Sequence, residues 1–337
     1  MGAQERACGF RKMRVPREEG AAHRLRKLIA LSFVLYFAAA IPAQTPAANP
    51  GRPTVTNPAT LPPVGYLQFE QGYLGSIASP ETASQYGINQ VTKIAVGSHL
   101  LLQAQTQPFA ASRAVSDQSS ENSSSLASGD ILLGAQAVLF LPQAASAEDS
   151  ANSANSKDAS TPAPLKITKP TISLGYLGRV HAGSTPDIDQ GGYANSLVLL
   201  VSGDIGAFHY DSNYIANEQT DDEPLAESAA ARTVRRAQLA ETLSVNHPLF
   251  TPSLQLSVEL YHFTQPFVFH DDAGHSVHRA HLVDCLFALS YSLRPNLVLD
   301  GGFSHGFTST STRWQSFAGF TYLLPHRLWH EKSQARS

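Results

Sequence analysis

The sequence predicts an all-β protein: a closed antiparallel transmembrane β-barrel of about 12 strands, with long external loops and short periplasmic turns. Three observations predict this fold. Side chains alternate between apolar and polar with a period of two, which is typical of strands. The candidate strands are even in number, and their lengths cluster near the roughly 9 to 11 residues with which a tilted strand crosses a bilayer. Long and tight connections alternate along most of the chain, as they do in outer-membrane barrels.

The composition indicates a protein with few charged residues on its surface. Charged residues make up 15% of the 337 residues, compared with about 25% in a typical soluble domain. The two cysteines, Cys8 and Cys285, exclude a disulfide framework and a four-cysteine zinc site. Glycine-rich phosphate loops and nucleotide motifs are absent, so we expect no cofactor.

Residues 1–43 have the features of a cleavable signal peptide. A basic cluster at 23–27 precedes an apolar run at 28–41, which is too short for a confident transmembrane helix, and small residues with a proline follow. Met13 is an alternative start. This segment carries eight Lys and Arg against three acidic residues, so the remainder is more acidic than the net charge of −3 of the whole chain. Nucleic acid is therefore not an expected partner.

The remaining segments follow from composition and alternation. Residues 44–62 are rich in Pro, Thr, Asn and Ala, which predicts a disordered, solvated leader. The barrel is expected over 63–324 and a C-terminal tail over 325–337. Alternation is clearest where Phe287 and Leu289 interleave with Asp284 and Ser290. In chain order the candidate strands are 64–74, 88–96, 98–106, 129–141, 169–180, 193–202, 204–213, 233–246, 253–263, 280–292, 296–305 and 312–324.

The connections predict which end of the barrel faces which compartment. Tight turns at Gly97, Gly203 and 293–295 are expected in the periplasm, and long loops outside. Two Ser-rich segments, 107–128 and 142–168, are expected to be disordered insertions, and the second would fall on the periplasmic side. Tyr and Phe near strand ends suggest interfacial girdles: Tyr66, Tyr73, Tyr193, Tyr291, Phe307, Trp314 and Tyr322. A secreted two-sheet sandwich is the alternative fold.

The polar register predicts which side chains line the lumen, because ionisable groups at mid-strand need water beside them. Both signs of charge occur, which suits a selective pore or a salt-bridged, plugged interior. Twelve strands give a bore between filled eight-stranded barrels and wide porins. The candidate lumen residues are Asp130, Gln136, Arg179, His181, Gln238, Gln255, Glu259, Asp284, Asp300, Arg313 and Gln315.

Three stretches resemble a known family. They are GDILLGAQAVLF from Gly129, ALSYSLRPNLVLDGGFSHGFT from Ala288 and WQSFAGFTYLL from Trp314. They are similar to the outer-membrane transporters grouped under the MetA pathway of phenol degradation, with a resemblance that would extend over 63–324. The resemblance implies a closed outer-membrane barrel and passage of small organic compounds, aromatic ones among them. It carries over no catalytic residue, because the shared motifs belong to strand architecture.

Two local patterns suggest chemistry. Imidazole and carboxylate ligands in one predicted external loop could bind zinc, copper or nickel, although polar loops also collect such residues for solubility. These candidates are His270, Asp271, Asp272, His275 and His278, with His281 close by. Ser304 could act as a lipid hydrolase nucleophile only if His262 or His281 reached it across strands, because its neighbour His305 points to the opposite face.

The sequence therefore predicts a non-enzymatic channel or transporter in the outer membrane of a Gram-negative bacterium. It would mediate passive uptake or efflux of small organic, hydrophobic or aromatic solutes. Outer-membrane lipid and the assembly machinery are the other expected partners. Two alternatives stay open: a lipid-modifying barrel enzyme, and a structural or adhesive surface barrel.

Overall fold

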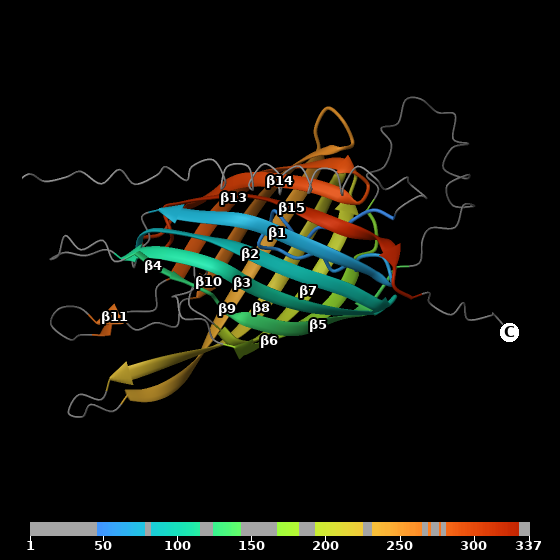
Figure 1. The fold of residues 1–337 in the computed structure, drawn as a ribbon. Coiled ribbons are helices and arrows are strands. Elements are labelled where there is room, and N and C mark those ends of the chain that lie inside the picture. The colour runs from blue at the N-terminus through green and yellow to red at the C-terminus, as the bar shows by residue number, and fades with distance from the viewer. Residues whose placement is uncertain are drawn as a thin grey trace, which may run out of the picture. The chain divides into compact units, whose positions relative to one another are not determined.

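A computed structural model describes residues 46–77, 82–114, 124–142, 167–181, 193–224, 231–264, 269–270, 276–277 and 281–329. Most of these residues belong to one antiparallel sheet that curls into a barrel (Figure 1). Within this described part no helix is long and apolar enough to cross a membrane.

Twelve long strands form the wall of the barrel. They are β1 (Tyr66–Ile77), β2 (Thr82–Gly97), β3 (Leu100–Ala114), β5 (Ile131–Phe140), β6 (Thr171–His181), β7 (Tyr193–Ile205), β8 (Phe208–Pro224), β9 (Ala231–Pro248), β10 (Leu254–Thr264), β13 (His281–Arg294), β14 (Leu297–Gly306) and β15 (Trp314–Arg327). The short β4 (Ser124–Ala127) pairs with the outer part of β3, alongside β5, and β11 (Phe269–His270) pairs with β12 (Ser276–Val277) outside the barrel.

The sheet closes on itself. Strand β1 pairs with β15 on one side and with β2 on the other, and β2 pairs in turn with β3, so the two edges of the strand order meet. Counting β4 and β5 as one position beside β3, the barrel has twelve strands, as the sequence predicts. In the described part of the chain, closure gives each of the twelve wall strands a neighbour on both sides. A membrane barrel requires this because lipid cannot satisfy unpaired backbone groups.

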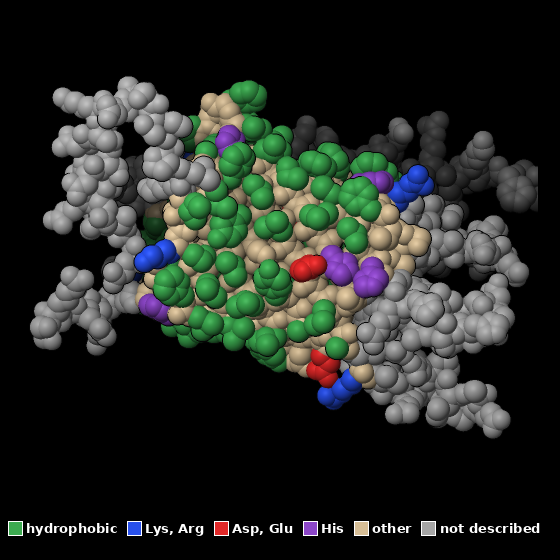
Figure 2. Space-filling model, turned by 180° about the vertical axis from the view of Figure 1, so that it is seen from behind, with side chains coloured by type: hydrophobic (Ala, Val, Ile, Leu, Met, Phe, Trp, Pro, Cys, Tyr) green, Lys and Arg blue, Asp and Glu red, His purple; other side chains and the backbone are tan. Residues whose placement is uncertain are grey.

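The predicted alternation between a buried polar face and an exposed apolar face is present at mid-strand in β10 and β13. On β10, Glu259 is fully buried on the inner face, whereas Leu260 points outward with 54% of its surface exposed. Strand β13 shows the same alternation, with Asp284 inside and Leu289 outside. On the face of the barrel seen in Figure 2, the outward side chains form a broad apolar surface. An apolar surface of this extent is stable against lipid acyl chains and unfavourable in water.

The two ends of the barrel differ. The tight turns that join β2 to β3, β7 to β8 and β13 to β14 lie at the same end as the start of β1 and the end of β15. We call this the turn end and the opposite one the loop end. The connection from β5 to β6 is also at the turn end, because Ile167 forms a β-bridge with Ile205. Residues 143–166 of that connection lie outside the described residues.

Several segments predicted as loops are strand. Residues 107–114 extend β3, and 124–127 form β4, so the described parts of the 107–128 segment are not a disordered insertion. Strand β8 continues to Pro224, where the sequence predicts a loop from residue 214. The extension of β8 beyond Asn217 has a polar sequence, and Arg235 pairs with Glu218 there at 2.9 Å. Backbone pairing continues toward the loop end after the apolar alternation has stopped, so periodicity alone could not detect it.

The leader prediction is wrong for the described residues 46–62. This segment, which we call the plug, lies inside the barrel and has no regular secondary structure. Ala59 has no exposed surface and Thr56 is 1% exposed. The disorder prediction rested on the lack of apolar side chains to bury. The lumen wall is itself polar, however, and it satisfies the backbone groups of the plug by hydrogen bonding.

Candidate functional site

The candidate site is the lumen. The plug occupies one part of it, and a cluster of apolar side chains lines another part. Glu259 on β10 binds the middle of the plug. Its carboxylate accepts hydrogen bonds from the backbone N–H of Val55 at 2.8 Å and of Thr56 at 2.7 Å. The Thr56 hydroxyl contacts the same carboxylate and lies 2.7 Å from the hydroxyl of Thr242 on β9. A buried carboxylate is stable only when hydrogen bonds or charges compensate it, and here the plug supplies them.

Neighbouring strands hold the next residues of the plug through backbone-to-side-chain bonds. Asn213 on β8 accepts from the Asn57 N–H at 2.7 Å and donates to the Asn57 carbonyl at 2.9 Å. The Ala59 N–H donates to Ser202 Oγ on β7 at 2.7 Å, and Gln136 on β5 donates to the Ala59 carbonyl at 3.0 Å. The plug is therefore a specifically bound segment.

Charged groups fix the first part of the plug. Arg52 pairs with Asp300 on β14 at 3.3 Å. A Cβ atom at Gly72 or Gly319 would meet the Arg52 guanidinium, and these two glycines face each other across β1 and β15. Because glycine has no Cβ atom, Gly72 and Gly319 leave room for the Arg52 side chain.

A second ion pair lies beside the first residues of the plug. Lys93 on β2 pairs with Glu70 on β1 at 2.7 Å, and both side chains are buried. The same carboxylate accepts a hydrogen bond from the Gly51 N–H at 3.1 Å. Charge in this part of the lumen is therefore neutralised locally.

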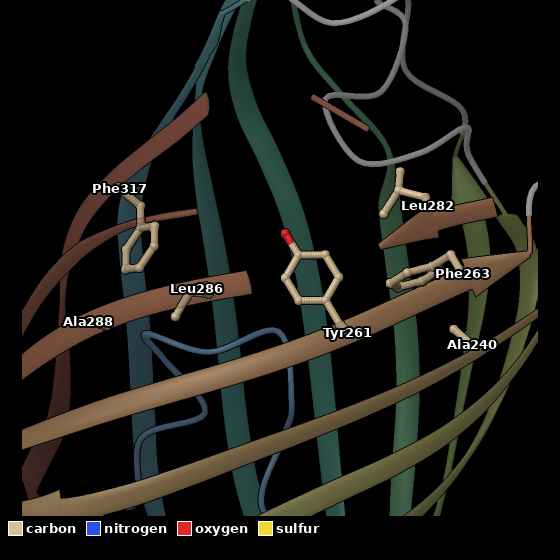
Figure 3. Close-up of a cluster of buried hydrophobic side chains, with 7 residues drawn as sticks. All are labelled: Ala240, Tyr261, Phe263, Leu282, Leu286, Ala288 and Phe317. Atoms are coloured by element: carbon tan, nitrogen blue, oxygen red, sulfur yellow. The ribbon is translucent and has the colours of Figure 1, made fainter. Parts of the chain in front are cut away.

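An apolar cluster fills the lumen wall beyond the plug. Side chains from β9, β10, β13 and β15 converge there (Figure 3): Ala240, Tyr261, Phe263, Leu282, Leu286, Ala288 and Phe317. Tyr261 and Phe263 meet edge to face at 6.0 Å between ring centres. In Figure 3 the plug, drawn in blue, loops inside the barrel below Leu286 and Tyr261.

A cavity of about 280 Å³ lies between the plug and this cluster. Its apolar lining comes from the cluster together with Leu74, Leu177, Val198 and Ile215, and its floor comes from residues 52–55 and 57 of the plug. Four buried amide side chains also line it: Asn213, Asn217, Gln238 and Gln315. The volume is near the lower end of about 300 to 1,000 Å³ for ligand sites, which suits a small organic molecule.

The structure places the predicted lumen residues as follows. Glu259, Gln136 and Asp300 contact the plug. Asp284 is buried and accepts a hydrogen bond from the Tyr261 hydroxyl at 3.1 Å, and Asp130 pairs with Arg179 at 3.1 Å.

The other predicted lumen residues have different surroundings. Gln238 and Gln315 line the cavity. Gln255 is on the inner register of β10 but exposed near the turn end, and Arg313 is exposed in the connection that leads into β15. For His181 only the backbone is described, at the end of β6.

Sequence reasoning missed the plug residues and the apolar inner cluster. A signal for the cluster was available, because Tyr261 and Phe263 occupy the polar register of β10 and Leu286 that of β13. Bulky apolar side chains on the water-facing register of a barrel indicate an apolar patch inside it. Nothing comparable marks the plug, because most of its partners are more than 70 positions away in sequence.

The structure describes the residues of the hydrolase hypothesis but not the side chains of the proposed metal ligands in 270–278. Ser304 is buried in the lumen and donates to Gln315 at 3.2 Å. His262 and His281 stack on each other at the outer surface, so the wall of the barrel separates them from Ser304. The proposed metal ligands Asp271, Asp272, His275 and His278 lie outside the described residues, as does the side chain of His270. Within the described part, no group of three or more ligating side chains could hold a metal ion.

A closed twelve-stranded barrel with an apolar outer surface and a polar, plugged lumen has the fold of an outer-membrane β-barrel. The family described as "Putative MetA-pathway of phenol degradation" matches residues 50–324, and the chain belongs to this family. No curated protein matches the chain.

Three solved structures are similar to this chain at low sequence identity. An outer membrane channel from Pseudomonas putida F1 is 12% identical, with a TM-score of 0.51 over 79% of this chain and 98% of that one. The NanC porin is 7% identical, with a TM-score of 0.42 over 76% of this chain and 99% of that one. A KdgM porin in complex with disordered oligogalacturonate is 9% identical, with a TM-score of 0.38 over 76% of this chain and 98% of that one.

Proposed function

We propose that this protein is an outer-membrane channel or transporter for small, mostly apolar organic solutes, aromatic compounds included. One observation carries the proposal: a cavity with an apolar, aromatic part of its lining lies inside a barrel whose other described lumen contacts are mostly polar. A small apolar solute loses its unfavourable contact with water on the apolar part of this lining, whereas a fully hydrophilic solute does not.

The relatives support this proposal. The family to which the chain belongs is described by a pathway of phenol degradation, and phenol is a small aromatic molecule. The structural neighbour from Pseudomonas putida is described as a channel. We further propose that the mature chain reaches the outer membrane after cleavage of a signal peptide within 1–43, and that assembly machinery inserts it among the lipids.

The plug sets a condition on transport. It occupies the part of the lumen nearer the turn end, where Ser202, Gln136 and Gln68 hold it. The cavity is on the other side of plug residues 52–55. In this function the plug must therefore shift before a solute passes from the cavity to the turn end.

The test is uptake by intact Gram-negative cells that produce the protein. We expect the protein to accelerate entry of radiolabelled toluene and to leave entry of radiolabelled xylose unchanged. Leu286→Gln places an amide in the apolar cavity and should reduce toluene entry several-fold, because the cavity then holds a polar group that the solute leaves unpaired.

The matched control is Leu289→Met, which changes an outward side chain on the same strand. Both variants must reach the outer membrane at wild-type levels. Faster entry of xylose than of toluene would indicate a hydrophilic pore. No effect on either solute would contradict transport and favour a structural or adhesive barrel.

A further inference from the structure

The cavity contains a pair of buried amides whose hydrogen bonding is incomplete. Asn217 on β8 and Gln238 on β9 are directly opposite each other in the sheet register. Asn217 Nδ2 donates to Gln238 Oε1 at 2.9 Å, and the two side chains are 5% and 1% exposed. Among the described residues, neither Asn217 Oδ1 nor Gln238 Nε2 has a partner.

This pair always offers one free donor and one free acceptor. Exchanging the oxygen and nitrogen of both amides, which look alike in shape, would reverse the bond between them and leave the same two kinds of group unsatisfied. Burying an unpaired amide donor and acceptor is unfavourable. A bound molecule that satisfies both groups would remove that penalty.

The pair borders the apolar cluster. One step along the inner faces of the same two strands lie Ile215 and Ala240, which are paired in register. Ala240 belongs to the cluster and Ile215 packs against it. Ala240 is also paired with Phe263 on β10. A molecule whose apolar body rests on the cluster can therefore present a polar group to the amide pair.

The charge of the cavity restricts that polar group. Arg52 is the only charged side chain among the described residues that line the cavity, and it is paired with Asp300. A carboxylate or an ammonium group would enter without a free counter-charge, which is costly in a buried site. The complementary group is neutral and both donates and accepts.

We propose that Asn217 and Gln238 form a recognition site for the hydroxyl group of a small apolar alcohol or phenol. The hydroxyl donates to Asn217 Oδ1 and accepts from Gln238 Nε2, while the carbon skeleton packs on Phe263 and its apolar neighbours. This inference rests on the proposed function for the cavity as a solute site, and it adds the functional group that the site selects.

The experiment compares two isosteric ligands, 4-ethylphenol and 4-ethyltoluene, by equilibrium dialysis against the full barrel in lipid nanodiscs. Empty nanodiscs give the blank for partition into lipid. The double variant Asn217→Leu/Gln238→Met removes both amides at similar volume. We expect it to weaken binding of 4-ethylphenol about tenfold, as for the loss of one or two hydrogen bonds. Binding of 4-ethyltoluene should change less than twofold.

The control variant is Gln71→Met, which makes the same chemical change on the outward register of β1, away from the cavity. It should alter neither dissociation constant, and gel mobility of unheated protein checks the fold of every variant. Equal binding of both ligands by the unmodified protein, or an unchanged preference in the double variant, would overturn the recognition site and leave transport of apolar solutes standing. If the unmodified protein binds neither ligand, the recognition site also fails, and the proposed function then depends on the uptake result alone.

Discussion

At the scale of single residues, the lumen of this barrel is a set of polar side chains with assigned partners. Glu259 is buried because two backbone N–H groups and a hydroxyl of the plug surround it. Arg52 occupies space that Gly72 and Gly319 leave open, next to Asp300. Each charge that the plug covers is thus compensated by the plug or by a neighbouring strand.

The Arg52–Asp300 pair makes a prediction about plug stability. Arg52→Gln or Asp300→Asn alone leaves one buried charge without its partner, so each should raise the frequency of channel openings in planar bilayers about tenfold. The double variant removes both charges and should behave more like the unmodified protein, with a coupling of roughly 0.5 to 3 kcal/mol. Single variants that match the unmodified protein, or effects that simply add, would mean that the pair does not hold the plug.

At the scale of elements, each strand separates a lipid face from a lumen face. Leu299 on β14 is 43% exposed and points outward, one position before the buried Asp300. Leu256 on β10 shares the outward register with Leu260. A shift of one residue in register would exchange these faces along the whole strand.

Charge on the outward register should therefore impair assembly. Leu299→Arg and Leu256→Arg each place a cation toward lipid, at a cost of about 2 to 4 kcal/mol near the bilayer midplane. We expect less folded barrel in the outer-membrane fraction for both. Gln255→Arg, on the inner register beside Leu256, is the control and should assemble normally. Equal yields for all three variants would contradict the assignment of faces.

The sequence predicted the strands well because alternation has a local cause. Residues such as Phe287 and Asp284 reveal their faces within one strand, and no partner needs to be known. The same logic fails for Arg52 and Thr56, whose partners Asp300 and Glu259 are more than 200 positions away. It also fails beyond Asn217 on β8, where both faces are polar and only backbone pairing continues the strand.

The candidate site was predictable only in its outline. Glu259, Asp300 and Gln136 were expected in the lumen from their register, and the structure adds that the plug binds them. The cavity depends on side chains from many strands that meet only after closure, among them Tyr261, Phe317 and Leu286. A buried donor without a hydrogen-bond partner, such as Gln238 Nε2, exists only in the folded state.

At the scale of the whole molecule, closure is the property that distinguishes the fold from an open sandwich. Strands β2 and β3 complete a ring in which each of the twelve wall strands has two neighbours. A closed ring has no edge strand from which unfolding can begin. Opening it in detergent or lipid requires breaking all the backbone hydrogen bonds between two neighbouring strands.

Closure should be visible as heat modifiability on a gel. Protein extracted from outer membranes in mild detergent and loaded without boiling should migrate differently from the boiled sample, because the intact barrel resists the detergent of the gel. A periplasmic protein with identical mobility in both samples would contradict the membrane barrel.

The contacts of the plug also bear on the order in which the barrel assembles. Its partners Glu70, Ser202, Asn213, Glu259 and Asp300 come from β1, β7, β8, β10 and β14, and their side chains surround it only once those strands form one ring. The plug precedes all of these strands in the chain, yet its complete set of partners is present only after the ring has closed. We therefore expect the lumen carboxylates to remain hydrated until the ring has closed.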